Sequence, residues 1–68
     1  MMKNIEIEHI VDEVENFREM QFLARVAGLT IERSGRKHFT MIWGNGKRCA
    51  VNIRWDEALA VLRAILTE

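Results

Sequence analysis

The chain has 68 residues, of which 49% are hydrophobic and 29% charged, with no proline and a formal net charge of zero. This length allows one domain, 1–68, and the composition excludes collagen-like and intrinsically disordered chains. No apolar run approaches the roughly 20 residues of a membrane span, and the N-terminus lacks the apolar stretch of a signal peptide. We therefore expect a cytoplasmic protein. The single cysteine, Cys49, can form neither an intramolecular disulfide nor a zinc site by itself.

The zero net charge hides a basic middle between acidic ends. Residues 1–27 carry six acidic and three basic side chains, residues 28–55 one and six, and residues 56–68 three and one. Two interpretations are open: the basic segment binds an anionic partner, or the acidic and basic segments neutralise each other within or between chains. The neutral total favours the second, because nucleic-acid-binding proteins usually carry a basic excess.

The first predicted element is a helix from Asn4 to Ala27, which ends before Gly28. Its first few residues also alternate as a strand would, so the start stays open. At about 100° per residue, an apolar stripe follows one face of the first half, and beyond residue 19 apolar residues cover most of the circumference. Either the helix breaks near Asn16, which can form a capping box with Glu19, or it continues and its first half docks outside its own sheet.

Three short apolar segments separated by turn residues follow, and they predict strands over 29–33, 39–43 and 48–54. The strongest hairpin signal is Asn45-Gly46, because both central residues of that tight turn need positive φ. In the third strand the alternation predicts three side chains on the core face: Cys49, Val51 and Ile53.

The last predicted helix starts at Asp56, as its N-cap, and runs to about Leu66. The element order is therefore α-β-β-β-α. A three-stranded antiparallel meander with both helices on its apolar face is the compact arrangement, since the sheet has one face to cover and the helices have apolar stripes to bury. The predicted fold class is α+β.

No catalytic or metal-binding constellation is evident in the sequence. His9 and His38 are the only histidines, and neither has partners at metal-ligand spacing. Cys49 alternates with apolar residues, where a free thiol behaves as a small apolar group. We therefore predict no catalytic residue, no metal, no cofactor and no small-molecule substrate.

Five residues are candidates for binding an anion or a nucleic acid. In a meander, the turn at 34–37 and the end of the third strand lie at the same edge, beside the start of the last helix and its exposed amides. The alternative is that Asp56 and Glu57 pair with neighbouring arginines and cap the helix. The candidates are Arg33, Arg36, Lys37, His38 and Arg54.

A second set of residues is predicted to bind a partner. A continuous first helix would be about 36 Å long, whereas a short strand spans about 17–20 Å, so one end would overhang. Pairing with a second copy would bury the overhanging stripe. We therefore predict a homodimer centred near Val14 and Phe17, with Trp55 as either a hydrophobic staple or a partner contact. The partner-binding candidates are Ile7, Ile10, Val14, Phe17 and Trp55.

Three segments of the middle resemble a known family: Gly28-Leu29-Thr30-Ile31-Glu32-Arg33, Arg36-Lys37-His38 and Asn45-Gly46-Lys47-Arg48. They are similar to the short HicA-like mRNA interferase toxins of prokaryotic toxin–antitoxin systems, whose α-β-β-β-α fold is related to double-stranded-RNA-binding domains. The resemblance implies this fold and contact with RNA. It also implies that His38 stands at the position of the family's catalytic histidine, which there follows glycine and serine.

The leading prediction is a small, non-enzymatic, prokaryotic or phage-type interaction module that binds a macromolecular partner as a homodimer through its N-terminal helix. A protein partner is favoured over nucleic acid, and no membrane contact is expected. The alternative is an RNA-binding protein of the HicA-like or double-stranded-RNA-binding type that contacts phosphates through the basic turn and Arg54. A ribonuclease acting through His38 is a third hypothesis.

Overall fold

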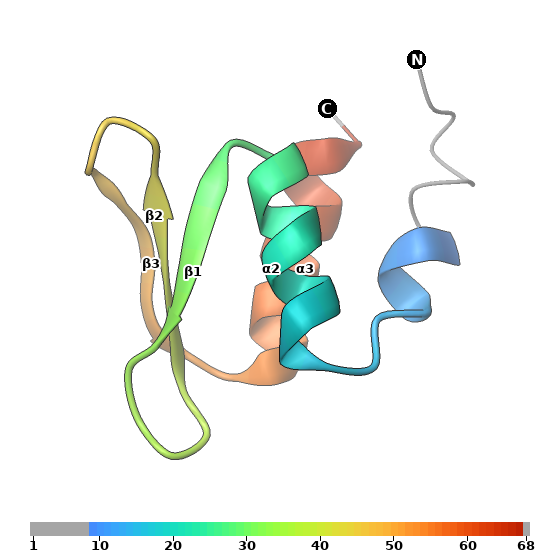
Figure 1. Cartoon of the computed structure of the whole chain (residues 1–68), viewed down its shortest axis with the longest axis horizontal. Coiled ribbons are helices and arrows are strands. Elements are labelled where there is room, and N and C mark those ends of the chain that lie inside the picture. Colours follow the sequence, from blue (N-terminus) through green and yellow to red (C-terminus); the bar gives the residue numbers. More distant parts are fainter. Residues whose placement is uncertain (1–8, 68) are drawn as a thin grey trace.

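The computed structural model describes residues 9–67. A short helical turn over residues 9–12 precedes the main elements (Figure 1): α2 (Phe17–Val26), β1 (Leu29–Arg33), β2 (Phe39–Trp43), β3 (Arg48–Ile53) and α3 (Trp55–Leu66). The strands form one antiparallel sheet in the order β1-β2-β3. The predicted α+β class and the α-β-β-β-α order are confirmed, with the first helix in two pieces. None of the helices described over residues 9–67 is long and apolar enough to cross a membrane.

The first helix is broken at Asn16, which was one of the two interpretations. Asn16 has an extended backbone with φ of −143°, and its side-chain oxygen accepts a hydrogen bond from the Glu19 backbone N–H at 3.0 Å. The Glu19 carboxylate in turn accepts from the backbone N–H of Glu15 at 3.0 Å. Helix α2 therefore starts afresh at Phe17, and the continuous helix is wrong; the predicted start at Asn4 lies outside the described residues.

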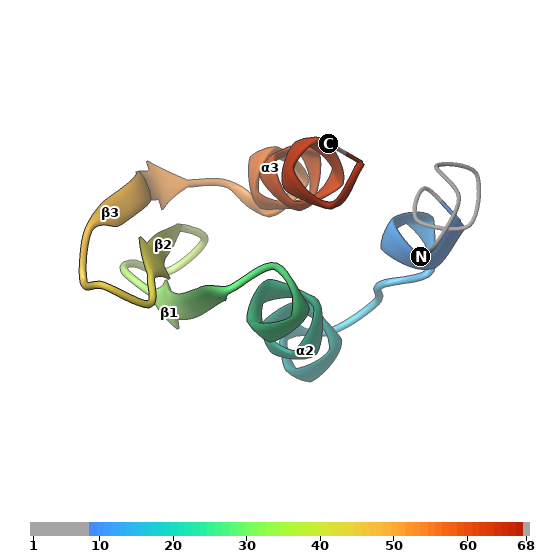
Figure 2. The same ribbon diagram turned by 90° about the horizontal axis from the view of Figure 1, so that it is seen from above.

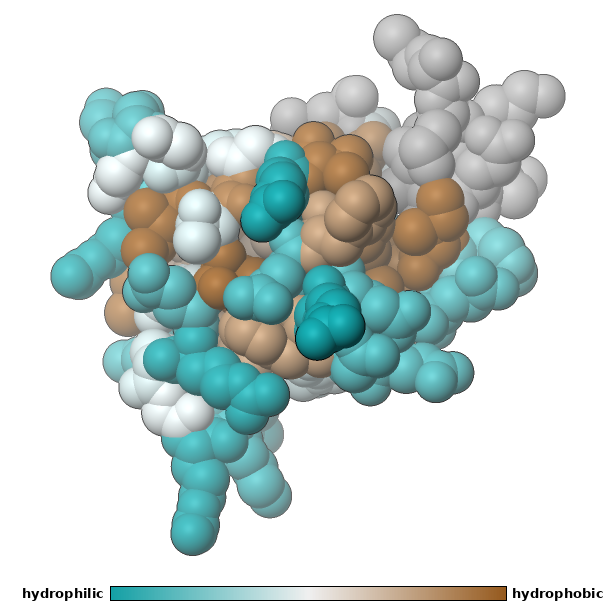
Figure 3. Space-filling view, viewed as in Figure 1, coloured by the Kyte–Doolittle hydropathy of each residue, from teal (hydrophilic) through white to brown (hydrophobic). Residues whose placement is uncertain are grey.

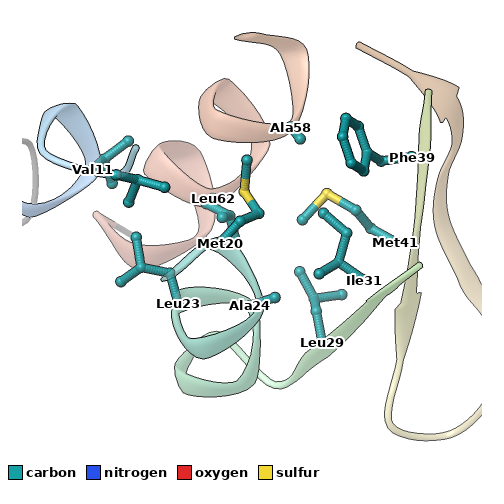
Figure 4. Packing of buried hydrophobic residues seen from close by; sticks show 11 residues of the cluster. Val11, Met20, Leu23, Ala24, Leu29, Ile31, Phe39, Met41, Ala58 and Leu62 are labelled. Carbon is teal, nitrogen blue, oxygen red and sulfur yellow. The ribbon is translucent and has the colours of Figure 1, made fainter. Parts of the chain in front are cut away.

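The molecule is layered, with the sheet on one side, α2 and α3 against one face of it, and the helical turn 9–12 beyond the helices (Figures 1 and 2). The fully buried large side chains come from every layer (Figure 4): Val11, Met20, Met41 and Leu62. An ion pair of 2.7 Å between Asp12 Oδ1 and Arg63 Nη2 also joins the turn to α3. The first segment thus folds back over the helix pair and completes the core.

The turn between β2 and β3 lies where the sequence predicts it but has another conformation. Gly46 is left-handed, with φ of 87°, whereas Asn45 keeps a negative φ. The Gly46 N–H donates to the Trp43 carbonyl at 2.9 Å, and the Trp43 N–H donates to the Lys47 carbonyl at 2.8 Å. This pattern is a type I turn followed by a glycine bulge, which needs one left-handed residue where the predicted turn needs two.

The predicted alternation of β3 is wrong at Val51. The register with β2 shifts twice along β3, which marks β-bulges. One of them contains Asn52, whose φ of 53° is a left-handed conformation that asparagine adopts more readily than most residues. The extra residue turns Val51 outward, where it is 45% exposed, while Cys49 and Ile53 pack against the core.

Helix α3 begins at Trp55, and its N-cap is Arg54, so the prediction of Asp56 as N-cap is wrong. Glu57 supplies the cap, because its carboxylate Oε1 accepts a hydrogen bond from the Arg54 backbone N–H at 3.1 Å. Both acidic residues stand in the first turn, where negative charge stabilises the helix dipole. Trp55 meets Phe39 edge-on, with ring centroids 5.8 Å apart.

Candidate anion-binding site

The predicted basic residues gather around one open hollow of about 560 Å³, which we call the basic hollow. The loop between β1 and β2 lines one side, and the junction of β3 and α3 lines the other, both at the lower end of Figure 1. Its lining contains four of the five anion-binding candidates. The full lining is Arg36, Lys37, His38, Phe39, Arg54, Trp55 and Asp56.

The sheet register explains why these segments meet. Phe39, the first residue of β2, pairs with Ile53, the last residue of β3. The loop residues just before Phe39 therefore stand beside Arg54, just after Ile53. The loop is closed by a hydrogen bond of 3.0 Å from the Ser34 N–H to the His38 carbonyl. A meander with short connections is enough to bring the two basic segments together.

Aromatic side chains lie against the inner side of the basic hollow. Phe39 stacks on Phe17, with centroids 5.7 Å apart, and meets Trp55 edge-on. Arg33, the fifth candidate, lies outside the lining, because its guanidinium carbon stands over the Phe17 ring at 4.7 Å from the centroid. Trp55, Phe39 and Phe17 form a row of contacting rings, and this cation–π contact holds Arg33 at the Phe17 end of it.

The basic side chains of the hollow form no ion pair with any acidic side chain in the part of the chain that the structure describes. The ion pair found there, Asp12–Arg63, lies elsewhere, as does the contact between His9 and Glu13. Asp56 lines the hollow but forms no ion pair with Arg54 or Arg36, and Glu57 caps α3. Of the alternative raised from the sequence, the structure therefore contains the helix cap. Over residues 9–67 it does not contain the ion pairs of Asp56 and Glu57 with neighbouring arginines.

The charge of the basic hollow suits an anion. Three cationic side chains, Arg36, Lys37 and Arg54, face one carboxylate, that of Asp56, which leaves a formal excess of two positive charges without His38. All of these residues are exposed, so a phosphate in solvent can reach them. Arginine forks bind phosphate oxygens in pairs, and lysine binds them as a point charge.

The predicted partner-binding stripe lies against the chain's own core. Val14 is 9% exposed and belongs to the core, and Ile10, Phe17 and Trp55 are half-buried against it. Ile7 lies outside the described residues. The folded chain therefore does not offer Val14 to a second copy. The homodimer itself stays a prediction and needs another contact face.

Sequence reasoning missed one exposed apolar surface, on α2. Phe22 and Val26 are 66% and 58% exposed, the largest values among the exposed large hydrophobic residues of the described chain. They stand one turn apart, so they share a helix face. The apolar residues beyond residue 19 predicted that this part of the helix is buried on several sides. The only available signal for an exposed face was that the helix carries more apolar residues than the sheet and the second helix can cover.

Metal-ligating and nucleophilic side chains do not cluster within residues 9–67, where no three His, Cys, Asp or Glu residues come together as a metal site requires. His9 Nε2 lies 2.9 Å from Glu13 Oε1 on the exposed face of the first turn. Cys49 is a free thiol packed against the core. His38 stands on the wall of the basic hollow.

Comparison of the chain with known protein families, with curated proteins and with solved structures finds no match. The resemblance to HicA-like toxins therefore rests on the three sequence segments and on the order of the elements.

Proposed function

We propose that the chain is a small binding module, without catalytic activity, that binds single-stranded RNA through its phosphates in the cytoplasm. The observation that carries this proposal is the gathering of Arg36, Lys37 and Arg54 around one hollow with no ion pair to a described acid. The sequence favours a protein partner in part because the neutral total indicates that the acidic and basic segments neutralise each other. Within residues 9–67, however, the basic side chains of the hollow form no ion pair with an acidic side chain, so they do not support this neutralisation.

A single strand fits the basic hollow better than a duplex. Double-stranded-RNA-binding domains span about 16 base pairs and place lysines at the start of the last helix. Here Asp56 and Glu57 stand in the first turn of that helix. A single strand needs only a short track of phosphate contacts beside aromatic side chains, and the half-buried Trp55 is an aromatic side chain in the lining of the hollow.

The salt dependence of binding tests this proposal. Three phosphate contacts on a single strand predict a slope of about −2 when log K is plotted against log salt concentration, since each contact contributes about −0.7. The measurement is fluorescence anisotropy of a labelled, unstructured RNA titrated with the full chain at several salt concentrations. Absence of binding at low salt would overturn the proposal.

Paired variants identify the site. Replacing Arg36 and Lys37 together by Ala should remove two of the three contacts and reduce the slope to about −0.7. The melting temperature should stay nearly constant, because exposed substitutions usually change stability by at most about 0.5 kcal/mol. The matched control replaces Lys47 and Arg48, an exposed Lys-Arg pair at the β2–β3 turn, and should leave the slope unchanged. Equal losses in both double variants would show that binding is not localised in the hollow.

A further inference from the structure

Helix α2 carries an uncovered apolar surface formed by Phe22 and Val26, which we call the α2 ridge. Figure 3 looks onto α2 and β1, and it shows apolar side chains in brown and tan between teal polar ones across the middle of this face. Phe22 is 66% exposed and Val26 58% exposed. Contiguous exposed apolar side chains rimmed by polar residues are typical of protein–protein contact surfaces.

Open hollows lie on both sides of the α2 ridge. The first, of about 280 Å³, separates α2 from the N-terminal segment, and its lining includes Ile10, Glu13 and Glu19. The second, of about 270 Å³, separates α2 from β1, and its lining includes Arg25. Arg18 and Phe22 line both hollows. At 100° per residue along α2, Arg18 and Arg25 fall on one side of Phe22 and Glu19 falls on the other. The ridge therefore has a basic flank, Arg18 and Arg25, and an acidic flank, Glu19 with the nearby Glu13.

Symmetry decides how two such ridges can meet. Two copies that pack α2 side by side are related by a two-fold axis. If the helices run antiparallel, the axis is perpendicular to both helices, and each flank meets the same flank of the partner. If the helices run parallel, the axis lies along them, and the acidic flank of each copy meets the basic flank of the other. Complementary charges favour the parallel arrangement.

We propose that a second copy of this chain covers the α2 ridge, with the two α2 helices parallel and Phe22 next to the two-fold axis. The ridge is self-complementary, because one copy supplies both the acidic and the basic flank. A partner of one charge sign would be repelled along one flank. This contact goes beyond the proposed RNA binding, and it gives the homodimer a face that the folded chain leaves exposed.

The molecular mass in solution gives the first test. Sedimentation equilibrium of the full chain at tens to hundreds of micromolar should give twice the monomer mass of 8.0 kDa. A monomer mass throughout this range would overturn the proposal. Phe22→Asp should give a monomer with an unchanged circular dichroism spectrum, whereas Val51→Asp, which changes a valine that is 45% exposed on the sheet, should stay dimeric. A dimeric Phe22→Asp variant would overturn the ridge as the contact.

A charge reversal tests the flanks even if the Phe22 variant fails to fold. Arg18 stands at nearly the same height as the partner's Glu19 when the helices run parallel. Arg18→Glu therefore places a carboxylate against the partner's acidic flank and should raise the dimer dissociation constant about tenfold or more. An unchanged dissociation constant would overturn the proposed pairing of flanks.

Cysteine cross-linking separates the two helix orientations. In a Cys49→Ala background, Val26→Cys copies should form disulfide-linked dimers with each other, because parallel helices place the two Val26 positions side by side. Antiparallel helices would instead place Val26 beside the partner's Arg18. Cross-linking only in a mixture of Val26→Cys and Arg18→Cys chains would overturn the parallel arrangement.

Discussion

At the scale of single residues, Arg54 has a structural role in its main chain and a proposed binding role in its side chain. Its backbone N–H donates to Glu57 Oε1 at 3.1 Å, and its carbonyl accepts from the Ala58 N–H at 2.9 Å. Both bonds use the main chain, so they do not depend on the side chain that the position carries. The guanidinium takes part in neither bond, and Arg54 lines the basic hollow. Stability and the proposed anion binding should therefore be separable by substitution at neighbouring positions.

We expect Arg54→Ala to weaken RNA binding about five- to tenfold, because a charge-assisted hydrogen bond contributes about 1 kcal/mol or more. Its melting temperature should change little, since the capping bonds remain. Glu57→Ala should do the reverse: the loss of the cap lowers the free energy of unfolding by about 1 kcal/mol, while RNA affinity stays the same or rises. Anisotropy titrations and thermal melts of both variants check this, and a similar loss of stability in both would contradict the separation.

At the scale of elements, the break at Asn16 allows the N-terminal segment to pack in its own core. A straight helix would carry Val14 away from the sheet, whereas the break lets the segment double back and bury Val11 and Val14 over α2 and α3. The capping signal of Asn16 and Glu19 is local, so the sequence contains it. The choice between a broken and a continuous helix depends on tertiary packing, so the sequence alone left both open.

The same distinction between local and tertiary information explains which of the other sequence-based predictions agree with the structure and which do not. The end of α2 was predicted because Gly28 supplies the left-handed backbone, with φ of 83°. The bulge at Asn52 was missed because it depends on how β3 registers against β2. The meeting of the turn at 34–37 with Arg54 was predicted from the meander topology, but the contact of Arg33 with the Phe17 ring depends on side-chain packing between distant elements.

Val14→Asp should now destabilise the folded chain rather than dissociate a dimer. A buried carboxylate without a partner typically lowers the free energy of unfolding by about 3 kcal/mol or more. The matched control is Val51→Asp, which changes a valine that is 45% exposed where Val14 is 9% exposed. Urea unfolding followed by tryptophan fluorescence measures both. A soluble, folded monomer with wild-type stability in Val14→Asp would support the predicted dimer centred on Val14 and Phe17.

At the scale of the whole molecule, the two proposed surfaces lie on different parts of the fold. The basic hollow is lined by the β1–β2 loop and the start of α3, whereas the α2 ridge faces solvent between β1 and the N-terminal segment. None of the residues of the ridge or its flanks lines the basic hollow. A dimer formed on the ridge would therefore leave the basic hollow of each copy open and present two proposed anion-binding sites in one particle.

This arrangement predicts that RNA affinity depends on dimerisation only when the RNA is long. An RNA that reaches one hollow should bind the wild-type chain and Phe22→Asp equally, because the hollow is intact in both. An RNA long enough to reach both hollows binds the second one intramolecularly, which typically strengthens binding by about a hundredfold or more. Anisotropy titrations with unstructured RNAs of increasing length should therefore give curves that coincide for short RNAs and separate above a threshold length. Coincidence at every length, in a wild-type chain shown to be dimeric, would mean that the two hollows do not act on one strand.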